Sequence, residues 1–295
     1  MSVFRTFMFA PGNHPRKVEK VFECGADAVI LDLEDAVARV EKVATRKPVA
    51  EALQRPRPNK AYVRVNAYNT EFCYGDLVAV VGAGLDGIVL PMVEDASDLA
   101  AVDWLIGNLE RERGLAPGSI DLMPIVETGK GMAKLREIAT AGTRVRRLVF
   151  GAGDYTLDMN IQWSLEEWEL DAARAEMVLA SRLGGLEAPI DTVWVHIKDI
   201  DNLTRSAQRV RAMGFQGKMC IYPPQVPAVN AVFTPSEAEV AHARRVVAAF
   251  AEAEKAGSSS IQLDGYFIDY PIVYKAQRIV AAMDAIEAQT RAAAE

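Results

Sequence analysis

The chain has 295 residues, of which 50% are hydrophobic and 25% charged, and its 33 basic and 40 acidic residues give a formal net charge of −7. This composition is that of an ordinary globular protein and excludes the disordered and fibrous classes. The acidic balance also argues against nucleic acid as the main partner, because phosphate backbones are bound by a clustered excess of Lys and Arg. Length alone allows one large α/β barrel or two medium domains.

The N-terminal segment contains one short apolar run, Phe7–Ala10, which ends at Pro11-Gly12. This run is too short for the core of a signal peptide or for a membrane span, so we expect a cytoplasmic protein that has no membrane partner. The cysteines are Cys24, Cys73 and Cys220, which are far apart and form no CxxC pair. Their spacing predicts buried thiols rather than a disulfide framework or a thiolate metal site.

Short β-forming runs alternate with longer helical patterns along the chain, which indicates a parallel sheet built from βαβ units. Segments such as Ala96–Arg113 and Leu165–Leu183 carry apolar residues at intervals of three and four, as amphipathic helices do. Eight strand–helix units predict an α/β protein with a (β/α)8 TIM barrel, and a doubly wound sheet is the alternative. The expected strands are Arg5–Ala10, Ala28–Leu33, Tyr62–Asn66, Gly87–Pro91, Asp121–Glu127, Arg147–Gly151, Val193–Ile197 and Lys218–Ile221.

The C-terminal part follows the eighth unit and begins with a helical pattern over Pro235–Ala256. The next residues, Gly257–Ser260, have the composition of a flexible linker. An extended piece over Leu263–Asp269 then leads to an Ala-rich helix from about Pro271. The last part is too small to form a core of its own. We therefore expect a barrel domain over residues 1–256 and a lid or oligomerisation segment over residues 257–295, packed on its own barrel or on a neighbouring subunit.

Acidic side chains follow several of the predicted strands, where the active sites of such barrels form. Asp32, Glu34 and Asp35 come at the end of the second strand, Glu127 ends the fifth and Asp154 follows the sixth. So many carboxylates at one barrel mouth repel each other unless a cation is present. An oxygen-only set without His or Cys suits Mg²⁺, with Mn²⁺ as a possible substitute. Glu127 and Asp154 fit the role of metal ligands best, because each comes just past a buried strand.

Each of these residues also has a purely structural explanation. Glu127 fits a surface charge beside a helix N-terminus, and Asp154 fits a turn, since Gly-x-Gly-Asp is good turn chemistry. The three acids of the second strand fit the cap of the next helix as well as a role in substrate binding or in support of the site. Arg64 lies inside an apolar strand, where an unpaired cation is costly. We therefore expect a carboxylate partner for Arg64, from the protein or from a substrate.

Seven short motifs are spread along nearly the whole chain. In chain order they are Arg5–Gly12, Leu31–Val37 (Leu-Asp-Leu-Glu-Asp-Ala-Val), Val63–Asn66 (Val-Arg-Val-Asn), Glu127-Thr128, Phe150–Tyr155, the run Gly214–Lys218 that leads to Ile221–Gln225, and Gly265–Pro271. Each motif is weak alone. In this order, together, they resemble the HpcH/HpaI aldolase and citrate lyase β-subunit superfamily, in particular its CitE-like acyl-CoA lyase branch.

The resemblance implies an enzyme that cleaves a carbon–carbon bond reversibly. Its substrate would be a 3-hydroxyacyl-CoA of the citramalyl-CoA or malyl-CoA type, and its products acetyl-CoA and a 2-keto acid. Glu127 and Asp154 would hold Mg²⁺, Arg64 would contact the reacting oxygen atoms, and Arg5 would help to form the site. Two related activities stay open: a citrate lyase β subunit that acts on an acyl-carrier-protein thioester, and a malate or citramalate synthase that also hydrolyses the thioester.

The resemblance also implies where coenzyme A and the catalytic acid lie. Arg16 and Lys17 would meet the phosphates of coenzyme A. A tail aspartate, matched here by Asp269, would close over the barrel of a neighbouring subunit as the catalytic acid or base. This arrangement implies a homo-oligomer, a trimer or a hexamer, with small molecules as its other partners. A flexible linker followed by a lid suits such a crossing.

Three positions depart from the pattern of the superfamily. Tyr222 stands where a His is common, Met92 where a Lys is frequent, and His196 in place of an acidic residue expected in the seventh strand. These departures concern substrate contacts rather than the predicted metal pair. A scaffold or regulatory subunit that keeps only the barrel is the non-enzyme alternative, and the joint presence of the metal pair, Arg64 and Asp269 argues against it.

Overall fold

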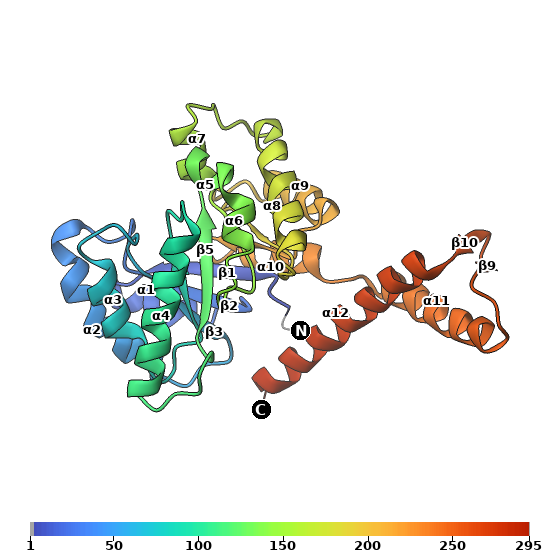
Figure 1. The fold of residues 1–295 in the computed structure, drawn as a ribbon, viewed down its shortest axis with the longest axis horizontal. Helices are drawn as coiled ribbons and strands as arrows, with labels where there is room; N and C mark the ends of the chain where they lie inside the picture. The colour runs from blue at the N-terminus through green and yellow to red at the C-terminus, as the bar shows by residue number, and fades with distance from the viewer. Residues whose placement is uncertain (1–2, 295) are drawn as a thin grey trace. The chain divides into compact units, whose positions relative to one another are not determined.

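A closed barrel of eight parallel strands is the core of the larger of two compact units in the computed structural model of the chain, which describes residues 3–294 (Figure 1). Each strand pairs with the next one in sequence, and the first pairs with the eighth. The predicted (β/α)8 TIM barrel is therefore confirmed. The strands are β1 (Thr6–Pro11), β2 (Ala28–Asp32), β3 (Lys60–Arg64), β4 (Gly87–Leu90), β5 (Asp121–Val126), β6 (Val149–Phe150), β7 (Ile190–Asp191) and β8 (Gly217–Cys220).

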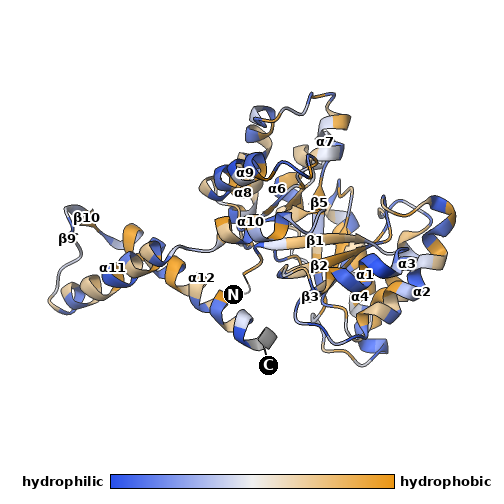
Figure 2. Cartoon of the chain, turned by 180° about the vertical axis from the view of Figure 1, so that it is seen from behind, coloured by the Kyte–Doolittle hydropathy of each residue, from blue (hydrophilic) through white to orange (hydrophobic). Residues whose placement is uncertain are grey.

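Helices follow every strand of the barrel, as the right-handed crossovers of a parallel sheet require. In Figure 2 these helices carry both hydrophilic and hydrophobic segments, as expected of a layer between the barrel and solvent. They are α1 (Pro15–Val21), α2 (Lys42–Leu53), α3 (Cys73–Val80), α4 (Ala96–Glu112), α5 (Gly129–Ala133), α6 (Leu135–Ala139), α7 (Ala152–Asp158), α8 (Asp171–Leu183), α9 (Ile200–Met213) and α10 (Gln225–Phe233), with short 3-10 turns η1 (Arg39–Glu41) and η2 (Trp168–Leu170).

The strands bury both of their faces, which explains why their sequences are continuous apolar runs. Alternate residues, such as Phe7, Ile30 and Met123, fill the inside of the barrel. Their neighbours along the strands, such as Leu31 and Leu122, belong to a second core between the barrel and the helices. This alternation fixes which side chains can reach the barrel mouth.

The seventh strand is not where the sequence pattern predicts it. The apolar run Val193–Ile197 lies outside the sheet, and β7 is the two-residue segment Ile190–Asp191 before it. The prediction relied on apolar content, but this run belongs to a loop. Trp194 is buried there, whereas Val195 and Ile197 are exposed. The bounds of the remaining strands differ from the predicted ones by at most two residues at either end, and β6 is shorter than predicted at both ends.

The boundary between the two units also differs from the predicted one. The barrel unit spans Phe4–Phe233, and the chain from Thr234 onward forms the second unit. Helix α11 (Glu237–Lys255) therefore belongs to the C-terminal unit and not to the barrel. Its apolar face supplies half of the buried core residues of that unit. The segment Gly257–Ser260 is a turn inside this unit rather than a linker between the two, with the Ser258 hydroxyl donating to the carbonyl of Ser260 at 2.6 Å.

The C-terminal unit consists of α11, an antiparallel hairpin of β9 (Ile261–Leu263) and β10 (Tyr266–Ile268), and the long helix α12 (Tyr270–Ala294). Apolar side chains of α11, β10 and α12 form its core: Ala243, Val246, Phe250, Ile268, Val273 and Ala276. The Ser236 side chain and the Glu239 carboxylate form a capping box that starts α11. Within residues 3–294, no helix has the length and apolar character that crossing a bilayer requires.

Candidate active site

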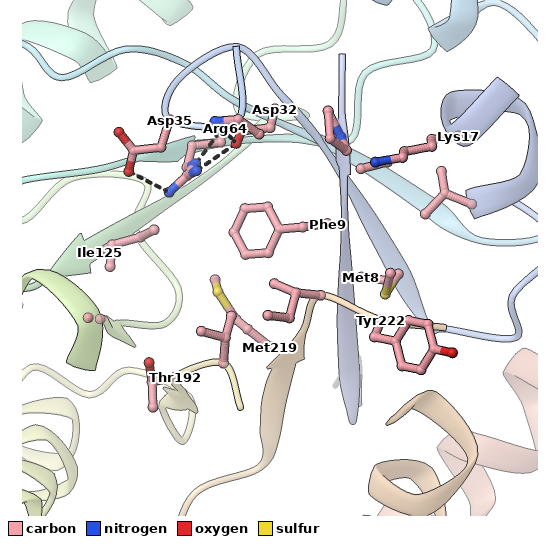
Figure 3. Close-up of a pocket in the computed structure, with 18 of the residues that line it drawn as sticks. Met8, Phe9, Lys17, Asp32, Asp35, Arg64, Ile125, Thr192, Met219 and Tyr222 are labelled. Carbon is pink, nitrogen blue, oxygen red and sulfur yellow. Dashed lines mark hydrogen bonds and ion pairs between the residues drawn. The ribbon is translucent and has the colours of Figure 1, made fainter. Parts of the chain in front are cut away.

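The C-terminal ends of the barrel strands surround a cavity of about 820 Å³. Its lining includes the ends of β1, β2, β3, β5, β6, β7 and β8, as expected of an active site in this fold. Six predicted site residues line it: Lys17, Asp32, Asp35, Arg64, Glu127 and Asp154. Figure 3 shows Asp32, Arg64 and Asp35 together at one side of the cavity.

Arg64, the last residue of β3, is held by carboxylates from the end of β2. Its Nε and Nη2 lie 2.8 and 2.6 Å from the two oxygens of Asp32. Burial alone would lower the pKa of Arg64, but Asp32 and the other nearby carboxylates raise it above its ordinary value, so the guanidinium stays charged. The predicted carboxylate partner of Arg64 is therefore confirmed. The ring of Phe9 packs against the guanidinium, with its centroid 4.9 Å from Cζ.

Glu34 and Asp35 complete the group around Arg64. Arg64 Nη1 lies 3.0 Å from Glu34 Oε2 and 3.9 Å from Asp35 Oδ2. Glu34 does not line the cavity, and its buried Oε2 is within ion-pair distance of Arg64 but accepts no hydrogen bond of good geometry. Burial raises the pKa of Glu34 to about 7, with Arg64 opposing the rise and the neighbouring acids adding to it. The Lys42 ammonium, which donates to the carbonyl oxygens of Leu33 and Glu34, fixes the backbone of this loop.

Glu127 follows β5 and is 4% exposed. Its Oε1 accepts the backbone N–H of Met92 at 2.8 Å, and Met92 has a left-handed backbone with φ of 53°. Burial raises the pKa of Glu127 to about 8; the Met92 N–H opposes the rise, and Asp154 and Glu34 add to it. Gly151 makes room for this carboxylate, because a Cβ there would lie 2.3 Å from Glu127 Oε2.

Asp154 lies in the first turn of α7 and faces Glu127. Burial and the charge of Asp35 raise the pKa of Asp154, whereas Arg64 and a hydrogen bond with Glu127 oppose the rise. In the described part of the chain, no three His, Cys, Asp or Glu side chains form a complete metal cage. A pair of facing carboxyl groups nevertheless suits Mg²⁺, which takes one or two protein carboxylates and keeps its other positions for water and substrate. The residues present therefore fit this metal.

Basic side chains reach the cavity from helix α1. Lys17 and Lys20 line it, but Arg16 does not and is exposed to solvent. Tyr222, which follows β8, also lines the cavity. In Figure 3, Lys17 and Tyr222 lie on the side away from Asp35. The cavity thus has a carboxylate-rich end around Arg64 and a basic end at α1, and of the two predicted phosphate contacts only Lys17 is placed at the basic end.

Arg5 is not brought to the site, contrary to expectation. It precedes β1 and lies at the opposite end of the barrel from the cavity, where its Nε and Nη2 bind the carboxylate of Asp27 at 3.0 and 2.6 Å. A residue before a barrel strand cannot reach the mouth beyond the end of that strand. The prediction that His196 lies in the seventh strand is also wrong. His196 lies in the exposed loop after β7, and the acidic residue within the strand is Asp191.

Asp269 lies in the C-terminal unit, immediately before α12. Its carboxylate is close to the backbone N–H of Ile272 at the start of the helix. The aromatic side chains of Tyr266, Phe267 and Tyr274 near it are exposed to solvent. The chain on either side of Asp269 therefore carries aromatic side chains that are accessible to solvent.

Sequence reasoning missed several residues of the cavity. Phe9 and Thr192 line it, but a Phe inside a strand and a Thr after one carry no distinctive pattern. Lys20 had a usable signal, because it lies three residues after Lys17 and thus on the same face of helix α1. Gly151 looked only like a turn residue, because the close approach of Glu127 cannot be seen in the sequence.

The chain matches the HpcH/HpaI aldolase/citrate lyase family over residues 5–223. A citrate lyase subunit beta from Leuconostoc mesenteroides subsp. cremoris is 38% identical over 95% of this chain and 93% of that protein. A (3S)-malyl-CoA thioesterase from Cereibacter sphaeroides is 35% identical over 97% of this chain and 96% of that protein. The structure is similar to that of the protein CitE from Mycobacterium tuberculosis in complex with magnesium, acetoacetate and coenzyme A, with a TM-score of 0.77, 28% identity, and coverage of 96% of this chain and 98% of that one.

The match, the relatives and the barrel with its carboxylate-rich mouth agree with each other. The family match covers most of the barrel unit, and the relatives extend over the C-terminal unit as well. The chain therefore belongs to the HpcH/HpaI aldolase/citrate lyase family and is an enzyme of the carbon–carbon lyase type.

Proposed function

We propose that this enzyme is a Mg²⁺-dependent lyase that reversibly cleaves a 3-hydroxyacyl-CoA of the citramalyl-CoA or malyl-CoA type into acetyl-CoA and a 2-keto acid. The observation that carries the proposal is the placement of Arg64 and the Glu127–Asp154 pair in one cavity that also receives Lys17 and Lys20. Carboxylates and a fixed guanidinium suit the keto-acid half of such a substrate. Lysine ammonium groups at the other end suit the phosphates of coenzyme A.

Glu127 and Asp154 would hold the metal, which when bound there supplies Lewis-acid polarisation of the keto-acid oxygens. Arg64 stabilises the negative charge that develops on the reacting oxygen atoms as the carbon–carbon bond breaks. Its guanidinium is already oriented by Asp32 and Phe9, so no reorganisation is needed when that charge appears.

Asp269 is proposed as the acid that protonates the carbon of the acetyl-CoA enolate, and as the base that removes that proton in the condensing direction. The exposed rings of Tyr266 and Phe267, which precede Asp269 in the chain, suit a lid that covers an apolar cavity. We propose that the C-terminal unit of one subunit supplies Asp269 to the barrel of another, so that the active enzyme is a homo-oligomer, a trimer or a hexamer.

Turnover of malyl-CoA and citramalyl-CoA with Mg²⁺, followed by release of the 2-keto acid, tests this proposal. We expect Glu127→Gln and Asp154→Asn to abolish cleavage and the Mg²⁺-dependent thermal shift of the protein. The matched control is Glu166→Gln, an exposed acid outside the cavity. Wild-type turnover by Glu127→Gln or Asp154→Asn would contradict the proposed metal site.

Exchange of the acetyl methyl protons with deuterium tests the role of Asp269. Asp269→Asn is expected to slow this exchange by roughly 10²–10⁴-fold, the usual contribution of a positioned acid or base, and to leave Mg²⁺ binding unchanged. Asp284→Asn changes an exposed acid on α12 and is the control within the same unit. Exchange at the wild-type rate in Asp269→Asn would contradict the proposed role of Asp269 as the acid or base.

Two neighbouring activities are distinguished by their products. A citrate lyase β subunit is favoured by the name of the relative at 38% identity, and it predicts activity on a carrier-protein thioester but none on a CoA thioester. Hydrolysis of the thioester is favoured by the name of the malyl-CoA thioesterase, and it predicts the release of free coenzyme A. Assay of the isolated chain with both thioesters, with detection of free thiol, separates the three activities.

A further inference from the structure

Thr192 brings a hydroxyl group into an otherwise largely apolar part of the cavity wall. It directly follows β7, is 3% exposed and lines the cavity. In Figure 3 it lies near Met219, on the side of the cavity away from Lys17. Ile125 and Val193 also line the cavity as apolar residues. An oxygen acceptor bound here would find few other donors.

The Thr192 hydroxyl has a hydrogen to donate. A hydroxyl has one hydrogen and two lone pairs. The backbone N–H of Ala152 donates to Thr192 Oγ1 at 2.9 Å and so uses a lone pair only. Within the described residues, no acceptor takes the Thr192 hydrogen. Since the side chain lines the cavity, a bound molecule can accept this hydrogen without any loss of protein contacts.

The position of this hydroxyl relative to Asp154 is fixed from two sides. Ala152 is the first residue of α7, which carries Asp154, so the Ala152–Thr192 hydrogen bond ties the two residues together. On the other side, Asp191 is fully buried and bound by Arg174, with Nε 2.9 Å from Oδ1, and by the Lys218 ammonium. The chain therefore cannot shift at Thr192 without breaking a buried ion cluster.

We propose that the Thr192 hydroxyl donates a hydrogen bond to an oxygen of the 2-keto acid and is a specificity-determining residue for that half of the substrate. The inference rests on the proposed function, which places the keto acid at Glu127 and Asp154. Thr192 is fixed beside α7 at that end, whereas Lys17 lies at the other. A keto-acid carboxylate is an acceptor that gains from this donor. A substrate without an oxygen there leaves the buried hydroxyl unpaired, which is penalised.

The test is calorimetric titration of pyruvate into protein saturated with Mg²⁺. We expect Thr192→Val to weaken pyruvate binding about 10–100-fold, as for the loss of a hydrogen bond to a charged group. Thr192→Ser keeps the hydroxyl and is expected to bind within about threefold of wild type. Thr192→Ser is also expected to leave the affinities for acetyl-CoA and Mg²⁺ unchanged. Thr192→Val leaves the Ala152 N–H without its acceptor, so we expect a small loss of Mg²⁺ affinity without pyruvate, well below the loss of pyruvate affinity, and no change in the affinity for acetyl-CoA. Thr192→Ala serves as a second apolar variant if Thr192→Val does not fold.

The matched control is Thr156→Val. Thr156 is a buried threonine of α7 that does not line the cavity, and among the described residues its hydroxyl bonds only to the backbone oxygens of Ala152 and Gly153. It is expected to bind pyruvate like wild type. Wild-type pyruvate affinity in the Thr192 variants overturns the inference alone. Equal losses of Mg²⁺ and pyruvate affinity overturn it in favour of a role in positioning α7. No binding of pyruvate to the wild type overturns the proposed function as well.

Discussion

Arg64 and Asp32 form a two-pronged ion pair between neighbouring barrel strands. The parallel register of β2 and β3 places the two residues side by side, and both oxygens of Asp32 accept from the guanidinium, at 2.8 and 2.6 Å. Two parallel hydrogen bonds fix the plane of the guanidinium as well as its position. The third nitrogen, Nη1, is left toward Glu34 and Asp35. The site thus holds its central cation in one orientation before any substrate arrives.

This geometry predicts that a substitution of Arg64 that keeps only its positive charge does not retain full activity. Arg64→Lys keeps the positive charge but loses the planar fork, so we expect kcat to fall by about 10²–10³-fold while the fold is retained. Steady-state kinetics and thermal unfolding of the variant measure the two effects. Arg39→Lys, at an exposed pair with Glu71, is the control. If Arg64→Lys turned over at the wild-type rate, the oriented guanidinium would have no part in catalysis.

Metal affinity is expected to depend on pH through Glu127. Because the pKa of this carboxyl is raised to about 8, the neutral acid dominates at pH 7 and Mg²⁺ must displace a proton. Affinity should therefore increase about fivefold from pH 7 to pH 8, reach about tenfold by pH 9, and level off above that. Calorimetry of Mg²⁺ binding in buffers of different ionisation enthalpy counts the released protons. Binding without proton release at pH 7 would contradict the protonated state of Glu127.

The same raised pKa predicts how the stability of the metal-free protein changes with pH. A carboxyl whose pKa is higher in the folded than in the unfolded state stabilises the fold most when it is neutral. Its contribution is therefore lost as the pH rises through about 8. Through this carboxyl we expect the melting temperature of the metal-free protein to fall between about pH 5 and pH 8 and to level off above that, and Mg²⁺ to reduce the fall. In Glu127→Gln, which does not titrate, this part of the pH dependence should be absent.

The barrel could be predicted from sequence because strands buried on both faces have continuous apolar runs, separated by turn residues. The same criterion failed at β7. There, sheet pairing ends at Asp191, a charged residue that no apolar pattern marks, and the apolar run after it forms a loop. The linker at Gly257–Ser260 failed for a related reason. A Gly/Ser composition predicts a flexible backbone, but a turn between a helix and a hairpin has the same composition.

The candidate site likewise combines residues that could be predicted from the sequence with contacts that could not. Asp32, Arg64, Glu127 and Asp154 were predictable, because polar groups at the ends of buried strands are costly unless they pair or bind a ligand. Contacts that depend on the closed barrel were not. The packing of Phe9 on Arg64 joins β1 to β3, and neither sequence segment indicates it.

Gly151 is predicted to be essential for the position of the Glu127 carboxylate. In Gly151→Ala the new Cβ would lie 2.3 Å from Glu127 Oε2 and 2.8 Å from Ile125 Cγ2, so the carboxylate must move. We expect a loss of the Mg²⁺-dependent thermal shift and a loss of about 1–3 kcal/mol of stability from overpacking. Gly153→Ala is the control, because a Cβ there meets no atom within 4 Å. Wild-type behaviour of Gly151→Ala would show that Glu127 is not confined.

The buried ion cluster behind β7 and β8 is expected to limit the stability of the barrel. Asp191 is fully buried, and although burial opposes it, Arg174 and Lys218 hold the pKa of Asp191 below its ordinary value. Asp191→Asn would leave two buried cations without their shared counter-charge. We expect this change to lower the free energy of unfolding by about 3–5 kcal/mol in urea titrations.

Asp171→Asn provides the matched comparison for this prediction. Asp171 pairs with Arg209 on the same side of the barrel, but both side chains are partly exposed, so solvent screens the pair. Its loss is expected to cost at most about 1 kcal/mol. Because Asp191 directly precedes Thr192, the partly destabilised Asp191→Asn protein should also bind pyruvate more weakly than Asp171→Asn does. Equal stability of the two variants would mean that the cluster is not the fixed support of the β7 end of the cavity.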